Sequence, residues 1–270
     1  MDRGSVDQAH LLDELVAAGL VPAAAGAAGR VTFVDTSRSN PSYLVLVDGE
    51  PTLFVKSQTA SVYGDATSTL AHEAAVQRLL SADPATSALA PRALRLLRAG
   101  VLVSEAVSPA VSYGEAMVSV FAEQSARGVG IAVATLHRST SDWCLPRRTP
   151  WVVEVDDGWH LGVQHEAIDR IHATVMNNRA LREAMWAVRD TWCATCVIHG
   201  DLKWDNVMVR RTGQVVLVDW ELAGTGDPRW DLAALCAAHR AAGVLDAQYC
   251  DPTAMRSLLA HIAEIGRAHV

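Results

Sequence analysis

The hydrophobic positions of this chain follow one spacing before about residue 105 and another after it. In the first part, short apolar runs have the length of β-strands, and they lie at 31–35, 43–47, 53–56 and 101–103. Asp48-Gly49 separates the second run from the third, and this pair predicts a tight β-hairpin. Apolar residues with helical spacing occur over 11–16, behind a Ser5-x-x-Gln8 capping box, and over 70–80. The pattern predicts a small sheet with few helices.

After residue 105 the helical spacing dominates. Helices are predicted over 115–137, 164–176, 179–192, 232–242 and 252–265. Gly128 and Gly130 are expected to interrupt the first of them. The exception is a predicted hairpin in which 207–209 pairs with 215–218 around Thr212-Gly213.

These patterns predict an α+β fold made of two lobes. Residues 1–104 are expected to form a small β-rich N-lobe with one key helix, residues 105–110 a hinge, and residues 111–270 a larger, mainly helical C-lobe. All eight tryptophans lie beyond residue 140, so the two parts also differ in composition. With 270 residues, half of them hydrophobic, the chain is long enough to bury such a core.

The composition argues against several classes of function. A net charge of −7 disfavours nucleic acid as a partner, because a phosphate backbone attracts basic surfaces. No run of about 18 apolar residues exists, so no membrane span is expected. Asp13 and Glu14 directly precede the apolar run over 15–29, which we therefore interpret as a helix end and loop rather than a signal peptide. We expect a cytoplasmic protein.

The five cysteines do not indicate a disulfide framework, because their number is odd and no secretory signal precedes them. Cys193 and Cys196 have the C-x-x-C spacing of a redox or zinc pair, but no second pair or histidine stands at ligand spacing. We interpret them as buried structural thiols.

The segment from His199 to Asn206 carries the clearest chemical pattern. Asn206 follows Asp201 by five residues, and the apolar run 215–218 ends on Asp219. An aspartate, an asparagine and a second aspartate at a strand end form the polar set of a kinase active site, in which one acid orients a hydroxyl and the other groups hold Mg²⁺ on a triphosphate. The spacing predicts phosphoryl transfer.

Each group in this set has a predicted role. Asp201 can accept the proton of an attacking hydroxyl, and Lys203 can place a positive charge beside the transferring phosphoryl group. Asn206 and Asp219 offer the hard oxygen ligands that Mg²⁺ prefers. Any one of these residues alone would be an ordinary loop residue, so the combination is what favours a kinase site.

Further segments extend the pattern: Val218-Asp219-Trp220-Glu221, Gly226 to Ala233, Leu136-His137 and Ser39 to Tyr43. Together with His199-Gly200-Asp201-Leu202, they make the chain resemble the aminoglycoside phosphotransferase and choline kinase-like family of the protein-kinase-like superfamily over about residues 30–240. The resemblance implies a bilobal protein-kinase-like fold. It also implies ATP as the phosphoryl donor, with GTP not excluded, and Mg²⁺ as the cofactor.

The resemblance implies roles for residues outside the catalytic segment. Lys56 would contact the α- and β-phosphates, with Glu73 as its ion-pair partner. Backbone groups of Glu105 and Val107 would bind the adenine base. Asp231 would brace the catalytic loop by accepting backbone hydrogen bonds.

The chain departs from the family's pattern in its loops and at its end. The phosphate-binding loop lacks the usual glycines, so Ser39, Asn40 and backbone amides are expected to contact the phosphates. Gly200 stands where protein kinases have arginine, and no A-P-E sequence follows Asp219, so control by activation-loop phosphorylation is not expected. The helical part at the end is shorter than is usual in the family, which leaves open a further domain or a partner protein beyond Val270.

The phosphate acceptor is left open by the sequence. A cationic aminoglycoside could bind a group of acidic residues: Glu154, Asp156, Asp157, Glu166 and Asp169. A solvated acidic surface is the simpler interpretation of this group. An apolar or anionic acceptor or a peptide could instead bind a segment rich in tryptophan and arginine, which contains Trp143, Arg147, Arg148, Trp151 and Trp159. Core packing is the more common role of tryptophan.

Three hypotheses follow from these residues. The first is an O-phosphotransferase that acts on a small molecule, either an antibiotic or a metabolite. The second is a Ser/Thr kinase that acts on a precursor peptide in lanthipeptide-like biosynthesis. The third is a nucleotide-binding pseudokinase or scaffold, against which the intact Asp201, Asn206 and Asp219 argue.

Overall fold

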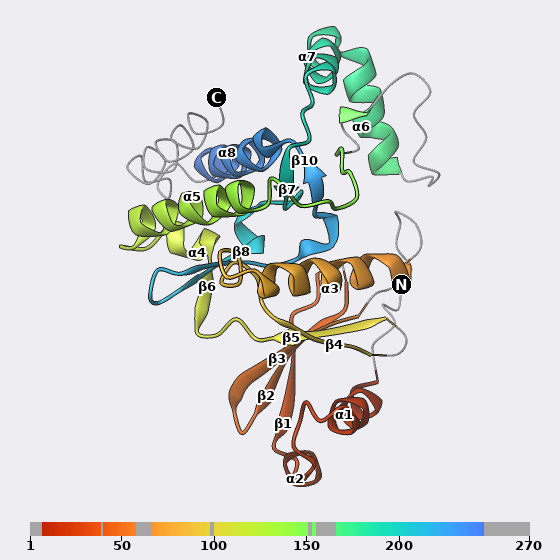
Figure 1. The fold of residues 1–270 in the computed structure, drawn as a ribbon, viewed down its shortest axis with the longest axis vertical. Coiled ribbons are helices and arrows are strands. Elements are labelled where there is room, and N and C mark those ends of the chain that lie inside the picture. The colour runs from red at the N-terminus through yellow and green to blue at the C-terminus, as the bar shows by residue number, and fades with distance from the viewer. Residues whose placement is uncertain are drawn as a thin grey trace.

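The computed structural model describes residues 7–38, 40–57, 66–97, 100–150, 153–154 and 166–245, and these form two lobes connected by the segment 106–109 (Figure 1). The strands of the N-lobe are β1 (Val31–Asp35), β2 (Ser42–Val47), β3 (Glu50–Ser57), β4 (Ala93–Leu97) and β5 (Val101–Glu105). They form one antiparallel sheet with the order β1-β2-β3-β5-β4.

The two faces of this sheet pack against different helices. On one face, Leu11 and Leu15 of α1 (Gln8–Ala17) share a buried cluster with Val103 of β5, and the short α2 (Ala23–Ala27) follows α1. On the other face, Leu70 of α3 (Ala66–Ala82) packs with Leu102, and α3 lies between the sheet and the C-lobe (Figure 1). The neighbours Leu102 and Val103 face opposite sides, as the two-residue repeat of a strand requires.

The C-lobe is mainly helical. Its helices are α4 (Tyr113–Met117), α5 (Ala122–Ser139), α6 (Glu166–Asn177), α7 (Arg179–Asp190) and α8 (Pro228–Leu245). Its strands are β6 (Ala110–Ser112), β7 (Cys196–Ile198), β8 (Val207–Arg210), β9 (Val215–Leu217) and β10 (Gly224–Gly226), and its short 3₁₀ helices are η2 (Trp204–Asn206) and η3 (Trp220–Leu222). The three strands β6-β8-β9 form one antiparallel sheet, and β7 pairs with β10. The pair α6–α7 projects away from the rest of the lobe (Figure 1).

Helix α5 runs through the core of the C-lobe. Its buried Val133 and Leu136 belong to the same cluster as Val197 of β7, Leu217 of β9 and Leu235 of α8. The strands that flank the catalytic segment are therefore anchored on a helix that lies more than fifty residues earlier in the chain.

The predicted α+β arrangement is confirmed, and most predicted elements occur close to their predicted bounds. At the predicted hairpin turn, Asp48 has a φ of 56° and Gly49 a φ of 85°, the left-handed geometry that Asp-Gly adopts in a tight hairpin. The sequence patterns do not predict β4 or the three-residue strands β6, β7 and β10. The predicted helix over 252–265 lies outside the described residues. Among the described helices, none combines the length and the apolar character needed to span a membrane.

The predicted interruption at Gly128 and Gly130 is wrong. The break lies earlier, between α4 and α5, and both glycines are inside α5. A Cβ on Gly128 would lie 3.0 Å from the carbonyl oxygen of Gly213 and 3.1 Å from the Val215 side chain. Gly128 is therefore explained by the close approach of α5 to the β8–β9 hairpin rather than by a helix end.

Two smaller predictions are also wrong. The N-cap of α1 is Asp7 rather than Ser5, because the Asp7 carboxylate accepts a hydrogen bond of 3.0 Å from the Ala9 amide. Cys193 is exposed, so of the C-x-x-C pair only Cys196 is a buried thiol. Burial raises the pKa of Cys196 to about 12, which makes a poor nucleophile or metal ligand.

Replacing Gly128 by valine is expected to lower the free energy of unfolding by about 1–3 kcal/mol, because the added atoms meet the Gly213 carbonyl and Val215. Urea unfolding of the purified variant measures the change. Ile131→Val is a matched control on the same helix, since Ile131 is 48% exposed, and it should change stability by less than about 0.5 kcal/mol. Equal stability of Gly128→Val and the unmodified protein would contradict the close approach.

Candidate active site

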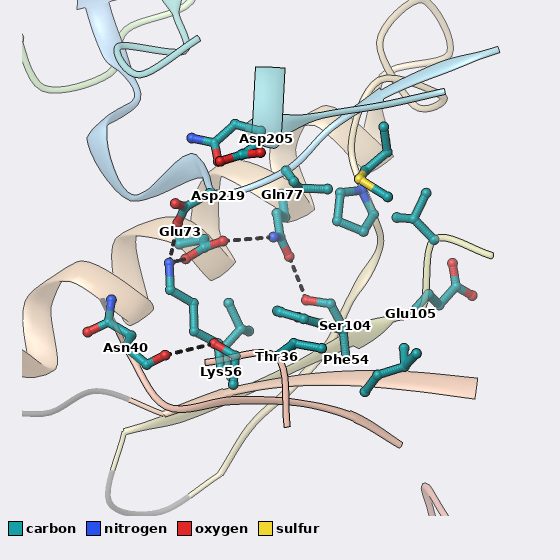
Figure 2. A pocket seen from close by; sticks show the side chains of 18 of the residues that line it. Thr36, Asn40, Phe54, Lys56, Glu73, Gln77, Ser104, Glu105, Asp205 and Asp219 are labelled. Atoms are coloured by element: carbon teal, nitrogen blue, oxygen red, sulfur yellow. Dashed lines mark hydrogen bonds and ion pairs between the residues drawn. The ribbon is translucent and has the colours of Figure 1, made fainter. Parts of the chain in front are cut away.

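A cavity of about 650 Å³ lies between the two lobes. Its apolar lining comes mainly from Leu44, Phe54, Leu102, Val107, Met208 and Val218. Its charged lining comes from Arg38, Lys56, Glu73, Glu105, Lys203, Asp205 and Asp219. In Figure 2, Phe54 and Ser104 lie on the right of the pocket, and Lys56, Glu73 and Asp219 lie on the left. The cavity can therefore hold a ligand that has an apolar part and a charged part.

The ammonium of Lys56, on β3, is the centre of the charged side. It donates hydrogen bonds to Glu73 Oε2 at 3.0 Å, to Glu221 Oε2 at 2.8 Å and to Asp219 Oδ1. The Lys56 residue is only 7% exposed. Burial opposes its ionisation, but the carboxylates of Glu73, Asp219 and Glu221 outweigh burial and raise the pKa of Lys56 above its ordinary value. Lys56 is therefore a fixed positive charge inside the cleft.

The three carboxylates around Lys56 come from both lobes. Glu73 lies on α3 of the N-lobe, as predicted for the partner of Lys56, whereas Asp219 and Glu221 lie in the C-lobe. Glu221 is not predicted in this role, although it belongs to the Val218–Glu221 segment that the sequence patterns single out. Burial raises the pKa of Glu73, while Lys56 overcomes the effect of burial on Asp219 and holds the pKa of Asp219 below its usual range.

A buried polar chain fixes the position of Glu73. Ser104 donates to Gln77 Oε1 at 3.0 Å, and Gln77 Nε2 donates to Glu73 Oε1 at 3.3 Å (Figure 2). The Trp220 amide donates to the same Glu73 oxygen at 3.3 Å. Gln77 is not predicted as a site residue, because a glutamine on a helix has no distinctive sequence signal.

The predicted catalytic residues meet on one loop. Lys203 Nζ lies 2.6 Å from Asp201 Oδ2, and Asn206 Nδ2 donates to the same oxygen and to the Asp201 carbonyl, each at 2.9 Å. Lys203 and Asn206 line the cavity, whereas Asp201 does not. The side chain of Asp201 is 33% exposed, so it is accessible from outside the cavity.

A buried histidine ties this loop to Asp219. Burial lowers the pKa of His199, so its ring is neutral at pH 7. Its Nε2 lies 2.9 Å from the Val218 carbonyl, which can only accept, so the proton is on Nε2. This tautomer leaves Nδ1 to accept from the Asp201 amide at 3.4 Å. The His199 ring thus links the Asp201 backbone to Val218, the residue before Asp219.

Asp231, on α8, braces the loop through its carboxylate. Its carboxylate accepts hydrogen bonds from the His199 amide at 2.9 Å and the Gly200 amide at 3.0 Å, and it lies 3.0 Å from Nε2 of the buried His137. Burial would raise the pKa of Asp231, but the hydrogen bond and charge of His137 lead a set of interactions that hold it below the usual range.

Gly200 has a backbone conformation that excludes other residues. Its φ is +85°, and a Cβ at this position would lie 2.5 Å from the Leu222 carbonyl oxygen. The space that a side chain would need at this position is filled by the loop after Asp219.

Asn206 and Asp219 both line the cavity and offer the oxygen atoms that Mg²⁺ prefers. Asp219 has the left-handed backbone angles φ 69° and ψ 61°, which are uncommon for a residue other than glycine and cluster at functional sites. Ligand oxygens of Glu73, Asp219 and Glu221 also lie within 4.8 Å of one another. The donor set therefore fits a hard divalent cation.

The predicted nucleotide-binding residues are placed as follows. Glu105 and Val107 line the cavity, and the Glu105 carboxylate accepts from Arg92 at 3.1 Å. Asn40 lines the cavity too and lies 3.5 Å from Glu221 Oε2, while Ser39 lies outside the described residues. Arg38 and Asp205, which are not predicted, form an ion pair at the same cavity.

The residues proposed for the acceptor receive little support. Trp143 is partly buried against the C-lobe core, which favours the core-packing interpretation, and Glu154 and Asp169 are exposed. Arg147 is exposed and Arg148 half-buried. The placement of Trp151, Trp159, Asp156 and Asp157 and of the Glu166 side chain lies outside the described part of the chain.

Comparisons with known proteins agree with this geometry. The sequence profile of the phosphotransferase enzyme family matches residues 30–259. A search among curated proteins found no match. One similar solved structure is the aminoglycoside phosphotransferase APH(3'')-Id from Streptomyces rimosus in complex with ADP and streptomycin. It has a TM-score of 0.62 at 19% identity, and the match covers 97% of this chain and 92% of that enzyme's chain.

Two other solved structures are similar to the chain. The choline kinase LicA from Streptococcus pneumoniae has a TM-score of 0.57 at 15% identity, covering 98% of this chain and 92% of its own. An aminoglycoside-3'-phosphotransferase of type VIII has a TM-score of 0.58 at 21% identity, covering 94% and 92%. These likenesses establish a protein-kinase-like fold.

Asp231→Asn is expected to lower the free energy of unfolding by about 1–3 kcal/mol at pH 7, because an amide cannot accept every hydrogen bond that the buried carboxylate accepts. Chemical unfolding measures the loss. Asp190→Asn is the control, since the Asp190 side chain is 71% exposed, and it should change stability by less than about 0.5 kcal/mol.

The stability difference between Asp231→Asn and the unmodified protein should also depend on pH. The folded pKa of Asp231 lies below its unfolded value, so its contribution is fully present above that unfolded value and is lost as the pH falls through the folded pKa. Unfolding curves should show a constant difference above about pH 5 and a smaller one below about pH 4. A difference that grows on acidification would refute this account of the brace.

Proposed function

Because the chain belongs to the phosphotransferase enzyme family and is a kinase-type phosphotransferase, we propose that it transfers the γ-phosphoryl group of ATP to a hydroxyl group of a small molecule, with Mg²⁺ as its cofactor. The observation that carries this proposal is the convergence of Lys56, Asn206 and Asp219 on one cavity, with Asp201 beside it.

The residues of the cleft suit each part of ATP. The apolar lining, which includes Phe54 and Leu102, matches a purine ring. Within the described chain, no group accepts a hydrogen bond from the Val107 amide, so this amide is available to a base. Lys56 supplies a permanent positive charge for the phosphates. The ADP in the Streptomyces rimosus enzyme supports an adenine nucleotide as the donor.

Asp201 is the proposed base of the reaction. The acceptor oxygen forms a bond to the γ-phosphorus, the bond to the β–γ bridging oxygen breaks, and ADP leaves. The hydroxyl proton passes to Asp201, which Asn206 and Lys203 hold in place through Oδ2. Asn206 and Asp219 would hold Mg²⁺, which neutralises charge on the triphosphate. Lys203, which lines the cavity and contacts Asp201, adds a positive charge beside the transferring phosphoryl group.

The acceptor is proposed to be a small molecule. Structures similar to this chain include kinases of choline and of aminoglycosides, which supports small hydroxyl compounds as the class. Of the acidic residues predicted to bind a cationic acceptor, Glu154 and Asp169 lie in the described part of the chain and are exposed. No contact among the described residues favours a peptide acceptor.

Replacing Asp201 by asparagine is expected to lower kcat by roughly 10²–10⁴-fold, because the general base is lost while the side-chain shape is retained. Turnover of Mg·ATP with a panel of aminoglycosides, amino alcohols and other polyols measures the effect, and the KM for ATP should change little. Asp48→Asn, in the β2–β3 turn, is the matched control and should leave kcat unchanged. Full turnover by Asp201→Asn would disprove the assignment of the base.

Chelation of divalent cations with EDTA is expected to abolish turnover, and added Mg²⁺ should restore it, because Asn206 and Asp219 are the proposed ligands. Asp219→Asn should remain inactive at a Mg²⁺ concentration that saturates the unmodified protein. Nucleotide binding by calorimetry without turnover of any acceptor on the panel would instead support the pseudokinase hypothesis.

A further inference from the structure

The β1–β2 loop uses its own backbone amides and cannot offer all of them to phosphates. The Thr36 amide donates to the Ser42 carbonyl at 2.9 Å, the Ser37 amide to Asp35 Oδ1 at 2.8 Å, and the Ser42 amide to Ser37 Oγ at 3.0 Å. Each amide has a single proton, so these three would have to break existing bonds in order to bind an anion. The cradle of backbone amides expected from the sequence is therefore partly closed here, because three of its amides already have acceptors.

A cationic side chain of the same loop stands at the cavity instead. The Arg38 guanidinium donates to Asp205 Oδ2, which lies in η2 of the C-lobe, and both residues line the cavity. Figure 2 shows Asp205 above Asp219, on the wall opposite the N-lobe strands. The ion pair thus spans the cleft beside the proposed metal ligands.

The charges around Arg38 indicate which cation can change its partner. Lys56 is buried and shared by three carboxylates, and Lys203 is paired with the proposed base Asp201. The Arg38 side chain is 69% exposed and pairs with one carboxylate that is 29% exposed. An exposed ion pair of this kind contributes little to stability, so Arg38 can leave Asp205 at small cost.

We propose that Arg38 is the residue with which this loop binds the phosphates of the nucleotide, and that Asp205 is the counter-charge that Arg38 leaves when they bind. The inference rests on the proposed function, because it names a further binding residue for the same nucleotide. A guanidinium presents two parallel N–H groups to phosphate oxygens, so one side chain replaces much of what a glycine-rich loop supplies through amides.

The pairing has a consequence for ligand selectivity. Arg38 contributes only to ligands that carry phosphates, so its loss weakens the binding of ATP and leaves adenosine unaffected. Asp205 competes with the phosphates for Arg38, so neutralising Asp205 strengthens ATP binding. The part of that gain that comes from releasing Arg38 is lost when Arg38 has been removed, so the gain is smaller in that background.

Isothermal titration calorimetry of the full chain with Mg·ATP and with adenosine tests the proposal. Arg38→Ala should raise the Kd for ATP by about 10-fold, the effect expected for one lost charge-assisted contact, without changing the Kd for adenosine. Arg38→Lys keeps the charge but not the two parallel N–H groups, so its Kd for ATP should lie between those of Arg38→Ala and the unmodified protein. Asp205→Asn should lower the Kd for ATP a few-fold, and the same substitution should lower it by a smaller factor in the Arg38→Ala background.

Arg30→Ala is the matched control. Arg30 also forms an exposed ion pair on the β1–β2 hairpin, with Asp48 at 2.6 Å, but neither residue lines the cavity. The variant should bind both ligands as the unmodified protein does.

The outcomes separate this inference from the proposed function. If the unmodified protein binds neither Mg·ATP nor adenosine, the proposed function fails. If it binds both and Arg38→Ala binds ATP equally well, the inference alone is overturned. The same holds if Arg38→Ala raises the Kd for adenosine by the same factor as the Kd for ATP. If Asp205→Asn weakens ATP binding or abolishes turnover as Asp219→Asn does, Asp205 is a metal ligand and its assignment as a counter-charge is wrong.

Discussion

The buried ammonium of Lys56 holds the cleft together. Burying an ammonium group away from water costs much free energy unless carboxylates surround it at hydrogen-bond distance. Here one carboxylate comes from α3 and two from the C-lobe, so the strand, the helix and the second lobe must all be in place to satisfy the charge. The same requirement keeps Asp219 ionised at the cavity wall, where a cation can be bound.

The catalytic loop depends on a second buried group, the Asp231 carboxylate. It holds two consecutive loop amides, while Trp230 Nε1 donates to the Gly200 carbonyl at 3.0 Å. The loop is also tied to the strand before Asp219, because the Val218 amide donates to the Asn206 carbonyl at 2.9 Å. Asp201, Asn206 and Asp219 are therefore held in fixed positions relative to one another, which suits a reaction that depends on positioning.

Helix α3 is fixed to the C-lobe by contacts with the segment that follows Asp219. His72 Nε2 lies 2.7 Å from the Ala223 carbonyl, and the Trp220 amide reaches Glu73. In protein kinases the Lys–Glu pair is assembled under the control of the activation loop. In this chain the segment after Asp219 contacts α3 through Trp220 and Ala223, and its Leu222 carbonyl fills the space beside Gly200. The absence of an arginine at this position has a steric reason here.

The sequence patterns predicted the features that depend on short segments. Each of these features is encoded within about twenty consecutive residues. They are the group formed by Asp201, Asn206 and Asp219, the Asp48-Gly49 turn and the main helices. The folded chain added contacts between residues far apart, such as the third carboxylate on Lys56, the Gln77 link to Ser104 and the Arg38–Asp205 pair across 167 positions. It also reversed the interpretation of Gly128, whose neighbour is a hairpin turn. Local spacing restricts which side chains can act together within one loop, but only packing brings separate elements within the few ångströms over which charges pair and atoms collide.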